Sequence, residues 1–217
     1  MQHTPEFTDC EADECSDNQK HKLKNKSEMM TKNETNNILL KSNIYPTKKP
    51  EKSFCNIDLG ELTHHNVKQL KVINQTIFPV SYNDKFYKDL LDMKDLVRLA
   101  YFNDIVVGGV CCRIDNVPSS VDNGSRKIYI MTLGCLAPYR RLGVGKIMLE
   151  HVLNIAKREN NIASVYLHVQ VNNEDALVFY KKNGFEIVQK AENYYKRIEP
   201  TDAYVVEKKL NHCSETN

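Results

Sequence analysis

The chain has 217 residues, of which 41% are hydrophobic and 27% charged, so one globular domain with an additional tail is expected. The formal net charge of +2 argues against nucleic acid as a main partner, and no direct nucleic-acid role is expected. The sequence contains no apolar run of about 18 residues, so no membrane span is expected, and its first residues lack the apolar segment of a secretion signal.

The cysteines indicate a reducing compartment. They are seven in number, which is odd, and none forms a Cys-x-x-Cys pair. Cys111 and Cys112 are adjacent in an apolar segment and are expected to pack as small hydrophobic residues. We therefore expect a cytoplasmic protein, with the nucleus as a second compartment. His64 and His65 have no partner at metal-ligand spacing, so they are interpreted as surface residues and no metal site is predicted.

Residues 1–53 form a predicted disordered tail, which is acidic up to Asp17 and rich in lysine from Lys20 onward. Neither half shows a hydrophobic period, so neither can bury enough apolar surface to offset the entropy of ordering. The lysine-rich half is interpreted as solvated, with a localisation signal or a contact with an anionic surface as the alternative. A folded domain is predicted for residues 54–210 and a disordered C-terminus for 211–217.

The folded domain is predicted to begin with a strand, Phe54–Leu59, and a helix for which Thr63 is the expected N-cap. Apolar residues recur in this helix at helical spacing. The helix is expected to end at Phe78-Pro79, because a residue before proline avoids helical angles. A shorter helix over about residues 84–92 follows.

The rest of the domain alternates between strands and helices. Asn103-Asp104 predicts a hairpin turn, segment 116–126 a loop, and Asn183-Gly184 a helix C-cap. With approximate bounds, the elements are strands 96–102, 105–114 and 127–136, a helix from Lys146, strand 163–171, helix 174–182, and strands 185–189 and 203–208. This order predicts an α/β (α+β) domain, a mixed sheet with helices packed on it.

The segment Arg140–Gly145 joins a strand to a helix and contains two arginines and two glycines. Glycine allows the backbone to approach a ligand closely, and the first N–H groups of a helix favour negative charge. A P-loop is excluded because Arg140 replaces its first glycine, and a dinucleotide fingerprint because Met148 replaces its third. Arg-x-x-Gly-x-Gly therefore predicts another kind of phosphate site, with a glycine-rich helix start without ligand as the alternative.

His168 lies in a strand of clear alternation, on the face opposite Val165, Leu167 and Val169. Its imidazole, with a reference pKa of about 6.5, is a candidate proton acceptor, either directly or through a water. From the residues alone, a structural histidine with satisfied hydrogen bonds is the commoner alternative.

The order of elements, the Arg140–Gly145 loop and the segment Asn172–Phe185 together resemble the GNAT acetyltransferases. In that family the last segment corresponds to an Asn-x-x-Ala-x-x-x-Tyr-x-x-x-Gly-Phe helix that flanks the pantetheine arm of coenzyme A. The resemblance covers about residues 56–210. It implies the GNAT acyl-CoA N-acyltransferase fold, a mixed and mostly antiparallel seven-stranded sheet flanked by about four helices, and acetyl-CoA as the acetyl donor.

Four shorter segments, 78–82, 129–133, 166–169 and 193–198, are similar to the NatE-type N-terminal acetyltransferases. Those enzymes acetylate the α-amino group of nascent chains and prefer an initiator methionine followed by a hydrophobic residue. The resemblance implies nascent polypeptide N-termini as substrate, with a NatA-type acetyltransferase complex and the ribosome as candidate partners. The chain departs from the pattern in its longer tail and its extended 116–126 loop.

The resemblance also implies roles for individual residues. Tyr129 and His168 are the predicted catalytic pair, Tyr180 is predicted to lie near the thiol sulfur, and backbone N–H groups near Leu133 are predicted to bind the oxyanion. The predicted cofactor contacts are Leu133, Gly134, Cys135, Leu136, Arg140, Arg141, Leu142, Gly143, Val144, Gly145, Lys146, Asn173 and Tyr180. The predicted substrate contacts are Phe78, Pro79, Val80, Tyr82, Met131, Tyr194, Tyr195 and Arg197.

Some of these residues have plainer alternatives. Tyr180 is otherwise a core tyrosine, and Arg197 otherwise contacts only solvent. The rings and hydroxyls of Tyr82, Tyr194 and Tyr195 suit a peptide backbone, with packing beneath a loop as the alternative.

Two other functions stay open beside α-amine acetylation. A lysine Nε-acetyltransferase must deprotonate an amine of pKa about 10.4 rather than about 7.7–8.0. The sequence offers no carboxylate at the catalytic strand positions for that task. A catalytically inactive GNAT scaffold of a ribosome-associated complex is disfavoured by the intact loop and by the Tyr129 and His168 pair.

Overall fold

The computed structural model describes residues 56–117, 125–159 and 161–210. The predicted disordered segments 1–53 and 211–217 lie outside the described residues, as does most of the predicted loop at 116–126. These three ranges form one domain around a single sheet.

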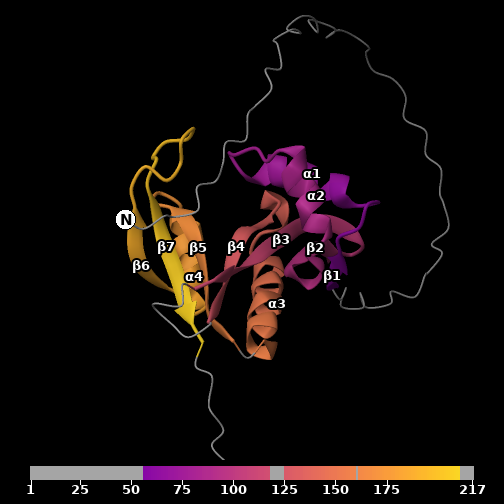
Figure 1. Ribbon diagram of the computed structural model, residues 1–217. Coiled ribbons are helices and arrows are strands. Elements are labelled where there is room, and N and C mark those ends of the chain that lie inside the picture. Colours follow the sequence, from indigo (N-terminus) through magenta and orange to yellow (C-terminus); the bar gives the residue numbers. More distant parts are fainter. Residues whose placement is uncertain (1–55, 118–124, 160, 211–217) are drawn as a thin grey trace, which may run out of the picture. The chain divides into compact units, whose positions relative to one another are not determined.

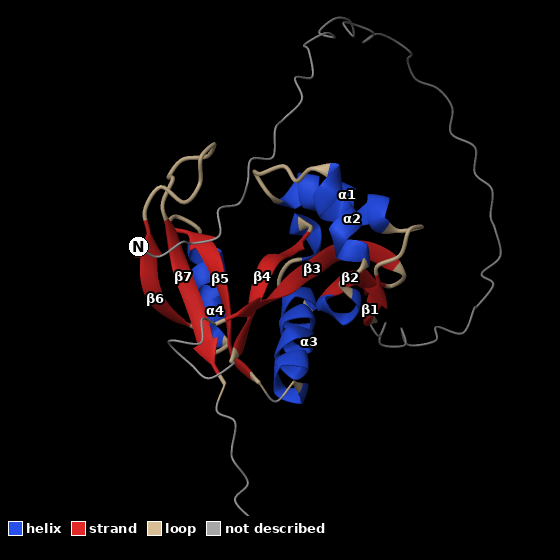
Figure 2. Cartoon of the chain, viewed as in Figure 1, coloured by secondary structure: helices blue, strands red, loops and turns tan. Residues whose placement is uncertain are grey.

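The domain contains seven strands and four helices (Figures 1 and 2). The strands are β1 (Ile57–Glu61), β2 (Val97–Phe102), β3 (Ile105–Asn116), β4 (Arg126–Cys135), β5 (Ile162–Gln170), β6 (Glu186–Ala191) and β7 (Ala203–Lys209). The helices are α1 (Val67–Ile77), α2 (Asp84–Leu91), α3 (Val144–Arg158) and α4 (Glu174–Lys182), with short 3-10 turns η1 (Lys94–Leu96) and η2 (Ala137–Tyr139). The predicted fold class is confirmed.

All strands belong to one sheet, in the order β1-β2-β3-β4-β5-β7-β6. Each neighbouring pair is antiparallel except β4 and β5, which are parallel because the chain returns through α3 before entering β5. The predicted hairpin between β2 and β3 is present, and Asn103 and Asp104 both have positive φ, as a tight hairpin turn requires.

The start of α1 differs from the prediction. The Asn66 side chain accepts a hydrogen bond from the Thr63 N–H at 2.7 Å and donates one to the Glu61 carbonyl at 2.8 Å. The Thr63 carbonyl accepts a hydrogen bond from the Val67 N–H at 3.0 Å. Thr63 therefore acts through its backbone in a turn before the helix, and the predicted Thr63 cap is wrong. The predicted end is confirmed, because Phe78 has extended angles.

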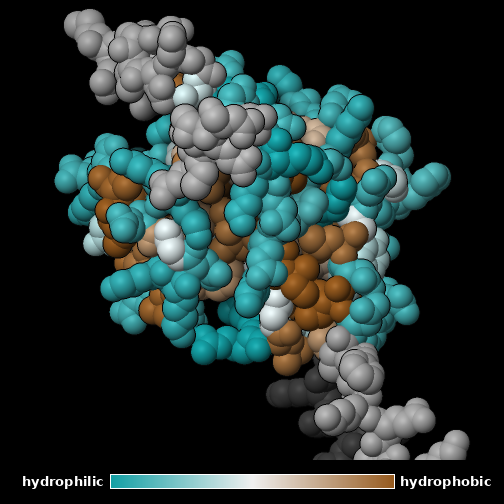
Figure 3. Space-filling model, turned by 90° about the horizontal axis from the view of Figure 1, so that it is seen from below, coloured by the Kyte–Doolittle hydropathy of each residue, from teal (hydrophilic) through white to brown (hydrophobic). Residues whose placement is uncertain are grey.

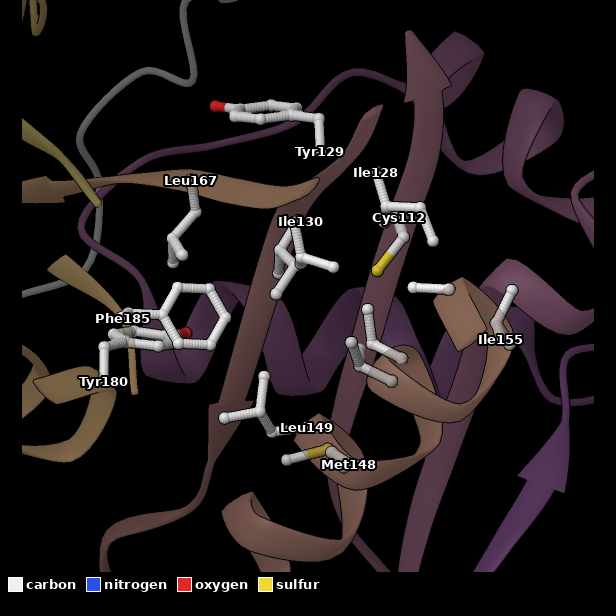
Figure 4. Packing of buried hydrophobic residues seen from close by; sticks show 14 of the residues in the cluster. Cys112, Ile128, Tyr129, Ile130, Met148, Leu149, Ile155, Leu167, Tyr180 and Phe185 are labelled. Carbon is white, nitrogen blue, oxygen red and sulfur yellow. The ribbon is translucent and has the colours of Figure 1, made fainter. Parts of the chain in front are cut away.

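Helices pack on both faces of the sheet. On one face, Leu70 of α1 and Leu90 of α2 pack with Cys111, and on the other face α3 packs against Cys112. Figure 4 shows that second cluster, with Met148, Leu149 and Ile155 near Ile128, Ile130 and Cys112, and with Tyr180 and Phe185 near Leu167. Both thiols are free, and burial raises the pKa of Cys111 to about 12 and the pKa of Cys112 well above its usual value. They pack as small hydrophobic residues, as predicted.

The surface is mostly polar on the face shown in Figure 3, where hydrophobic residues form separate groups among hydrophilic ones. The large hydrophobic side chains that are exposed are Val72, Ile105, Leu142, Val178, Ile187 and Val188. Within the described ranges, none of the helices combines the length and the apolar character that crossing a membrane needs.

The strands β4 and β5 separate part of the way along the sheet. Their pairing ends at Tyr129 opposite Tyr166, although β4 continues to Cys135 and β5 to Gln170. Figure 1 shows the two strands moving apart towards the side on which α1 and α2 lie. Beyond that point the facing backbone groups of the two strands do not pair with each other.

A bulge lies in β4, close to the point at which its pairing with β5 ends. Cys111 of β3 pairs with Thr132 and Cys112 pairs with Ile130, so Met131 is an extra residue on β4. A bulge bends its strand and changes the direction of neighbouring side chains. Met131 contacts both hydrophobic clusters and is only partly buried.

Candidate active site

The predicted phosphate loop connects β4 to α3. Arg141 and Gly143 have φ values of 66° and 98°, so the chain makes a left-handed turn immediately before the helix. Gly143 is the N-cap residue and supplies no side chain to the first N–H groups of α3. Those N–H groups and the positive end of the helix dipole are therefore directed at an anion that occupies this turn.

The neighbouring residues fix this turn in place. The Arg140 Nε donates a hydrogen bond to the Cys135 carbonyl at 3.3 Å, which joins the loop to the end of β4. Leu136 N–H donates to the Val107 carbonyl at 2.8 Å. A Cβ atom at Gly145 would lie 3.6 Å from Phe179, so α4 packs close to the first turn of α3. Lys146 forms an exposed ion pair with Glu150.

The helix predicted to flank the cofactor begins at Asn173. The Asn173 side-chain oxygen accepts a hydrogen bond from the Ala176 N–H at 3.2 Å and so caps α4. The NH₂ group of this side chain has no part in this cap and can donate to a ligand. Tyr180 lies deeper, where its ring packs edge-on against Phe179 and Phe185, and burial raises the pKa of its hydroxyl. Tyr180 is thus a core side chain, and its contact with a thiol stays a prediction.

The predicted catalytic pair lies where β4 and β5 begin to separate. The Tyr129 hydroxyl is 3.2 Å from His168 Nδ1 and 2.9 Å from the Tyr194 hydroxyl. The Tyr194 ring stacks on the His168 ring, with centroids 4.0 Å apart and planes 8° apart. The structure therefore brings the pair together and adds Tyr194 as a direct neighbour of both.

Three residues that the sequence reasoning missed lie beside Tyr129. Arg113 of β3 and Tyr166 of β5 are its cross-strand partners. The Arg113 guanidinium lies 4.6 Å from the centre of the Tyr129 ring and forms an ion pair with Asp115 at 2.9 Å. The Tyr166 hydroxyl donates to Asp115 at 2.6 Å. Two signals could have indicated them: Arg113 and Asp115 are charged residues near the end of an otherwise apolar strand, and Tyr166 lies in the segment 166–169 that resembles the NatE-type enzymes.

Both side chains of the predicted catalytic pair are neutral near pH 7. Burial, and then the Arg113 charge, lower the pKa of His168 to about 4. Burial, followed by the neighbouring Tyr194, raises the pKa of Tyr129 far above its usual value. Tyr129 therefore remains a hydroxyl that donates or relays a proton, whereas His168 is an acceptor.

Tyr194 of the β6–β7 loop contacts this pair, and Tyr82 of the α1–α2 loop lies within electrostatic range of Tyr194. Tyr82, between α1 and α2, stacks on Phe86 at 4.4 Å, and Tyr195 lies edge-on to Tyr194 at 4.9 Å. Burial raises the pKa of Tyr82, and Cys111, Tyr195 and Tyr194 add to the effect, so Tyr82 lies within electrostatic range of the other loop. Burial also raises the pKa of Tyr195 to about 12.

The other predicted substrate residues have varied positions. The Phe78 ring lies against Gly134, where an added Cβ would be 2.8 Å from its Cζ atom. Val80 is half-buried, whereas Pro79 and Arg197 are exposed. Among the described side chains, no group of three or more metal-ligating residues is present.

The fold and site define an acyltransferase that binds a phosphate-bearing donor. The acetyltransferase (GNAT) family model matches residues 67–185, and the chain belongs to this family. The chain is 60% identical over 154 residues to N-alpha-acetyltransferase 50 of Danio rerio, covering 71% of this chain and 89% of the relative. It is 59% identical over 158 residues to probable N-acetyltransferase san of Drosophila melanogaster, covering 73% of this chain and 83% of the relative.

A solved structure is similar in both sequence and fold. Arabidopsis thaliana Naa50, in complex with the bisubstrate analogue CoA-Ac-MVNAL, is 47% identical, with a TM-score of 0.65. The match covers 71% of this chain and 99% of the Arabidopsis chain. The family resemblance and fold that the motifs predicted are confirmed.

Proposed function

We propose that this N-alpha-acetyltransferase prefers protein N-termini that begin with methionine followed by a hydrophobic residue. The observation that carries the proposal is the contact of Tyr194 with the Tyr129 and His168 pair, with Tyr195 packed edge-on against Tyr194. Rings with hydroxyl groups suit a peptide, because they pack against apolar side chains and bond to the backbone. The Arabidopsis relative supports this preference, since the analogue in its structure carries the peptide MVNAL.

Acetyl-CoA fits the turn at the start of α3, because its left-handed Gly143 leaves the first helical N–H groups uncapped by a side chain. Arg140–Lys146 would hold the pyrophosphate, and the end of β4, Leu133–Leu136, would line the arm together with Asn173 and Tyr180. The donor supplies the activated acetyl group. The backbone N–H groups near Leu133 would bind the carbonyl oxygen as it gains negative charge.

His168 is the proposed proton acceptor for the α-amine. In this proposal His168 has its proton on Nδ1, which would donate to the Tyr129 oxygen 3.2 Å away, and Tyr129 would in turn donate to the Tyr194 hydroxyl 2.9 Å away. This arrangement leaves Nε2 as the acceptor, either directly or through a water. Because an α-amine has a pKa of about 7.7–8.0, much of it is already neutral near physiological pH, and a weak base suffices.

The pH dependence of kcat/KM is expected to report the substrate amine rather than His168. The pKa of His168 is lowered to about 4, so the imidazole is neutral at every pH above that value and loses its acceptor role only below it. Protonation of the α-amine removes the nucleophile as pH falls through about 8. The measurement is kcat/KM between about pH 5.5 and 8.5, and a second loss of activity near pH 6.5 would contradict the assignment.

The first residue is proposed to contact Phe78, Pro79, Val80, Tyr82 and Met131, and the following backbone Tyr194, Tyr195 and Arg197. The proposed substrate preference is tested by mass spectrometry of three otherwise identical peptides, which begin Met-Leu, Met-Glu and Ser. We expect Met-Leu to be acetylated fastest, by about tenfold or more, since one buried Leu-sized side chain contributes about 1.5–3 kcal/mol. Equal rates for Met-Leu and Ser would refute the preference.

We further propose that the protein acts on nascent chains at the ribosome, alongside a NatA-type complex, in the cytoplasm with the nucleus as a second site. The resemblance to NatE-type enzymes motivates this proposal. Sedimentation of cell extract on a sucrose gradient tests it, and complete absence of the protein from ribosomal fractions would refute it.

A further inference from the structure

The loop between β6 and β7 contains Tyr194 and Tyr195 of the candidate active site. One acidic residue, Asp202, links the two ends of this loop. Asp202 Oδ1 accepts a hydrogen bond from the Asn193 N–H at 3.0 Å, and Oδ2 forms an ion pair with Lys190 at 2.6 Å. The Asp202 carbonyl accepts a hydrogen bond from the Val171 N–H at 3.2 Å. Asp202 therefore joins the end of β6, the start of the loop and the residue after β5.

Thr201 links the two ends of the same loop to each other, and Gln170 links the loop to the strand that carries His168. Thr201 donates from its hydroxyl to the Asn193 side-chain oxygen at 3.3 Å, and its carbonyl accepts from the Tyr195 N–H at 2.8 Å. Gln170, on the same face of β5 as His168, donates to the Pro200 carbonyl at 2.8 Å. The two ends of the loop are thus held to each other and to β5.

The turn at Asn193 passes directly into the active site. Asn193 has a φ of 53°, a left-handed conformation that residues other than glycine adopt infrequently and asparagine adopts more readily than most. The hydroxyl of the next residue, Tyr194, forms a hydrogen bond with the Tyr129 hydroxyl at 2.9 Å. The Tyr194 ring stacks on the His168 ring with the two centroids 4.0 Å apart. No flexible residue separates the turn from these contacts, so a change in the turn displaces the Tyr194 ring.

We propose that Asp202 is a positioning residue for the peptide substrate, whose carboxylate fixes the turn at Asn193 and thereby holds Tyr194 and Tyr195 beside Tyr129 and His168. Asp202 acts through the loop and does not touch the reacting atoms. The inference rests on the proposed peptide site. It concerns the peptide rather than acetyl-CoA, because the contacts of Asp202 lead to the β6–β7 loop and not to the turn before α3.

Steady-state kinetics of three variants test the proposal with the Met-Leu peptide. Asp202→Ala is expected to raise the KM for peptide by about tenfold, as loss of one hydrogen bond to a charged acceptor allows, with the KM for acetyl-CoA within about twofold. The KM of Asp202→Asn for peptide is expected to lie between those of wild type and Asp202→Ala, because the amide oxygen of asparagine can still accept a hydrogen bond from the Asn193 N–H. Asp95→Ala is the matched control, since the Asp95 carboxylate likewise forms ion pairs, here with Arg98 and Arg158, and its loss should change neither KM.

Backbone amide exchange gives a second readout that does not depend on the substrate. The amides of Asn193–Tyr195 are expected to exchange about tenfold faster in Asp202→Ala than in wild type or Asp95→Ala. Unchanged exchange, or equal increases in the KM for peptide and acetyl-CoA, would overturn the role of Asp202. If wild-type protein does not acetylate the Met-Leu peptide, the proposed specificity fails, and the exchange result still decides whether Asp202 fixes the loop.

Discussion

Replacing His168 by alanine is expected to lower kcat for peptide acetylation by about 10²–10⁴-fold, the range that a general base contributes. The imidazole is kept neutral by burial and by Arg113, and its Nδ1 is held by Tyr129, so the ring is oriented to accept the amine proton. The turn before α3, which is the predicted phosphate site, follows the end of β4, away from His168. The Kd for acetyl-CoA should therefore stay within about twofold of the wild-type value. The measurements are kcat from steady-state kinetics and the Kd for acetyl-CoA from calorimetry.

His168→Phe is the control for packing in this experiment. Phenylalanine retains an aromatic face for the Tyr194 ring, which stacks on His168 at 4.0 Å, but has no proton acceptor. It should therefore lose activity to a similar extent as His168→Ala. Activity near the wild-type level in His168→Phe would show that the ring has a packing role only. Loss of acetyl-CoA affinity in both variants would likewise make His168 a structural residue.

Gly143→Val is expected to weaken acetyl-CoA binding by about 10–100-fold. Gly143 has a φ of 98°, and a β-branched residue held in such a conformation costs about 1–3 kcal/mol. Relief of this strain would move the first N–H groups of α3 away from the position in which they face a phosphate. Calorimetric titration with acetyl-CoA measures the effect, and the melting temperature shows whether the fold persists.

Gly184→Val is the matched control for backbone strain in this experiment. Gly184 also has a positive φ, 81°, but it follows the end of α4 and is not among the predicted cofactor contacts. The acetyl-CoA affinity of Gly184→Val should change much less than that of Gly143→Val. If Gly143→Val binds acetyl-CoA as tightly as wild type, the left-handed turn does not form the phosphate site.

The features of the site that follow short periods or motifs were predictable from the sequence. Alternation in the strand of His168 gave the correct face, and Arg140–Gly145 gave the turn before α3, because each depends on residues close together in the chain. The aromatic loops were identified by resemblance. The prediction that Tyr129 and His168 lie together depended on the parallel pairing of β4 and β5, which the family fold supplied.

Features that depend on strand register were not predictable. Arg113, Asp115 and Tyr166 become neighbours of Tyr129 only through cross-strand pairing, and no local pattern reports that pairing. The bulge at Met131 is equally invisible, since it exists only relative to β3. The wrong cap at Thr63 has a related origin, because the turn there is closed by the Asn66 side chain and the Glu61 carbonyl rather than by a helix-capping hydroxyl.

The structure also bears on the lysine alternative. Asp115 is linked to Tyr129 through Arg113 and Tyr166, and both of these side chains already bind its carboxylate. A base that must deprotonate an amine of pKa about 10.4 is therefore not supplied by this group. An inactive scaffold would have no need of the paired Tyr129 and His168 side chains at 3.2 Å.

Acetylation of the α-amine is tested most directly by locating the acetyl group on a peptide that begins Met-Leu and contains an internal lysine. The wild-type protein, acetyl-CoA and this peptide are incubated, and tandem mass spectrometry locates the modification; the same peptide with a blocked N-terminus is treated in parallel. We expect acetylation of the α-amine in the free peptide and no acetylation of the blocked peptide. Acetylation of the lysine in the blocked peptide, or no turnover of either peptide while coenzyme A still binds, would contradict this expectation.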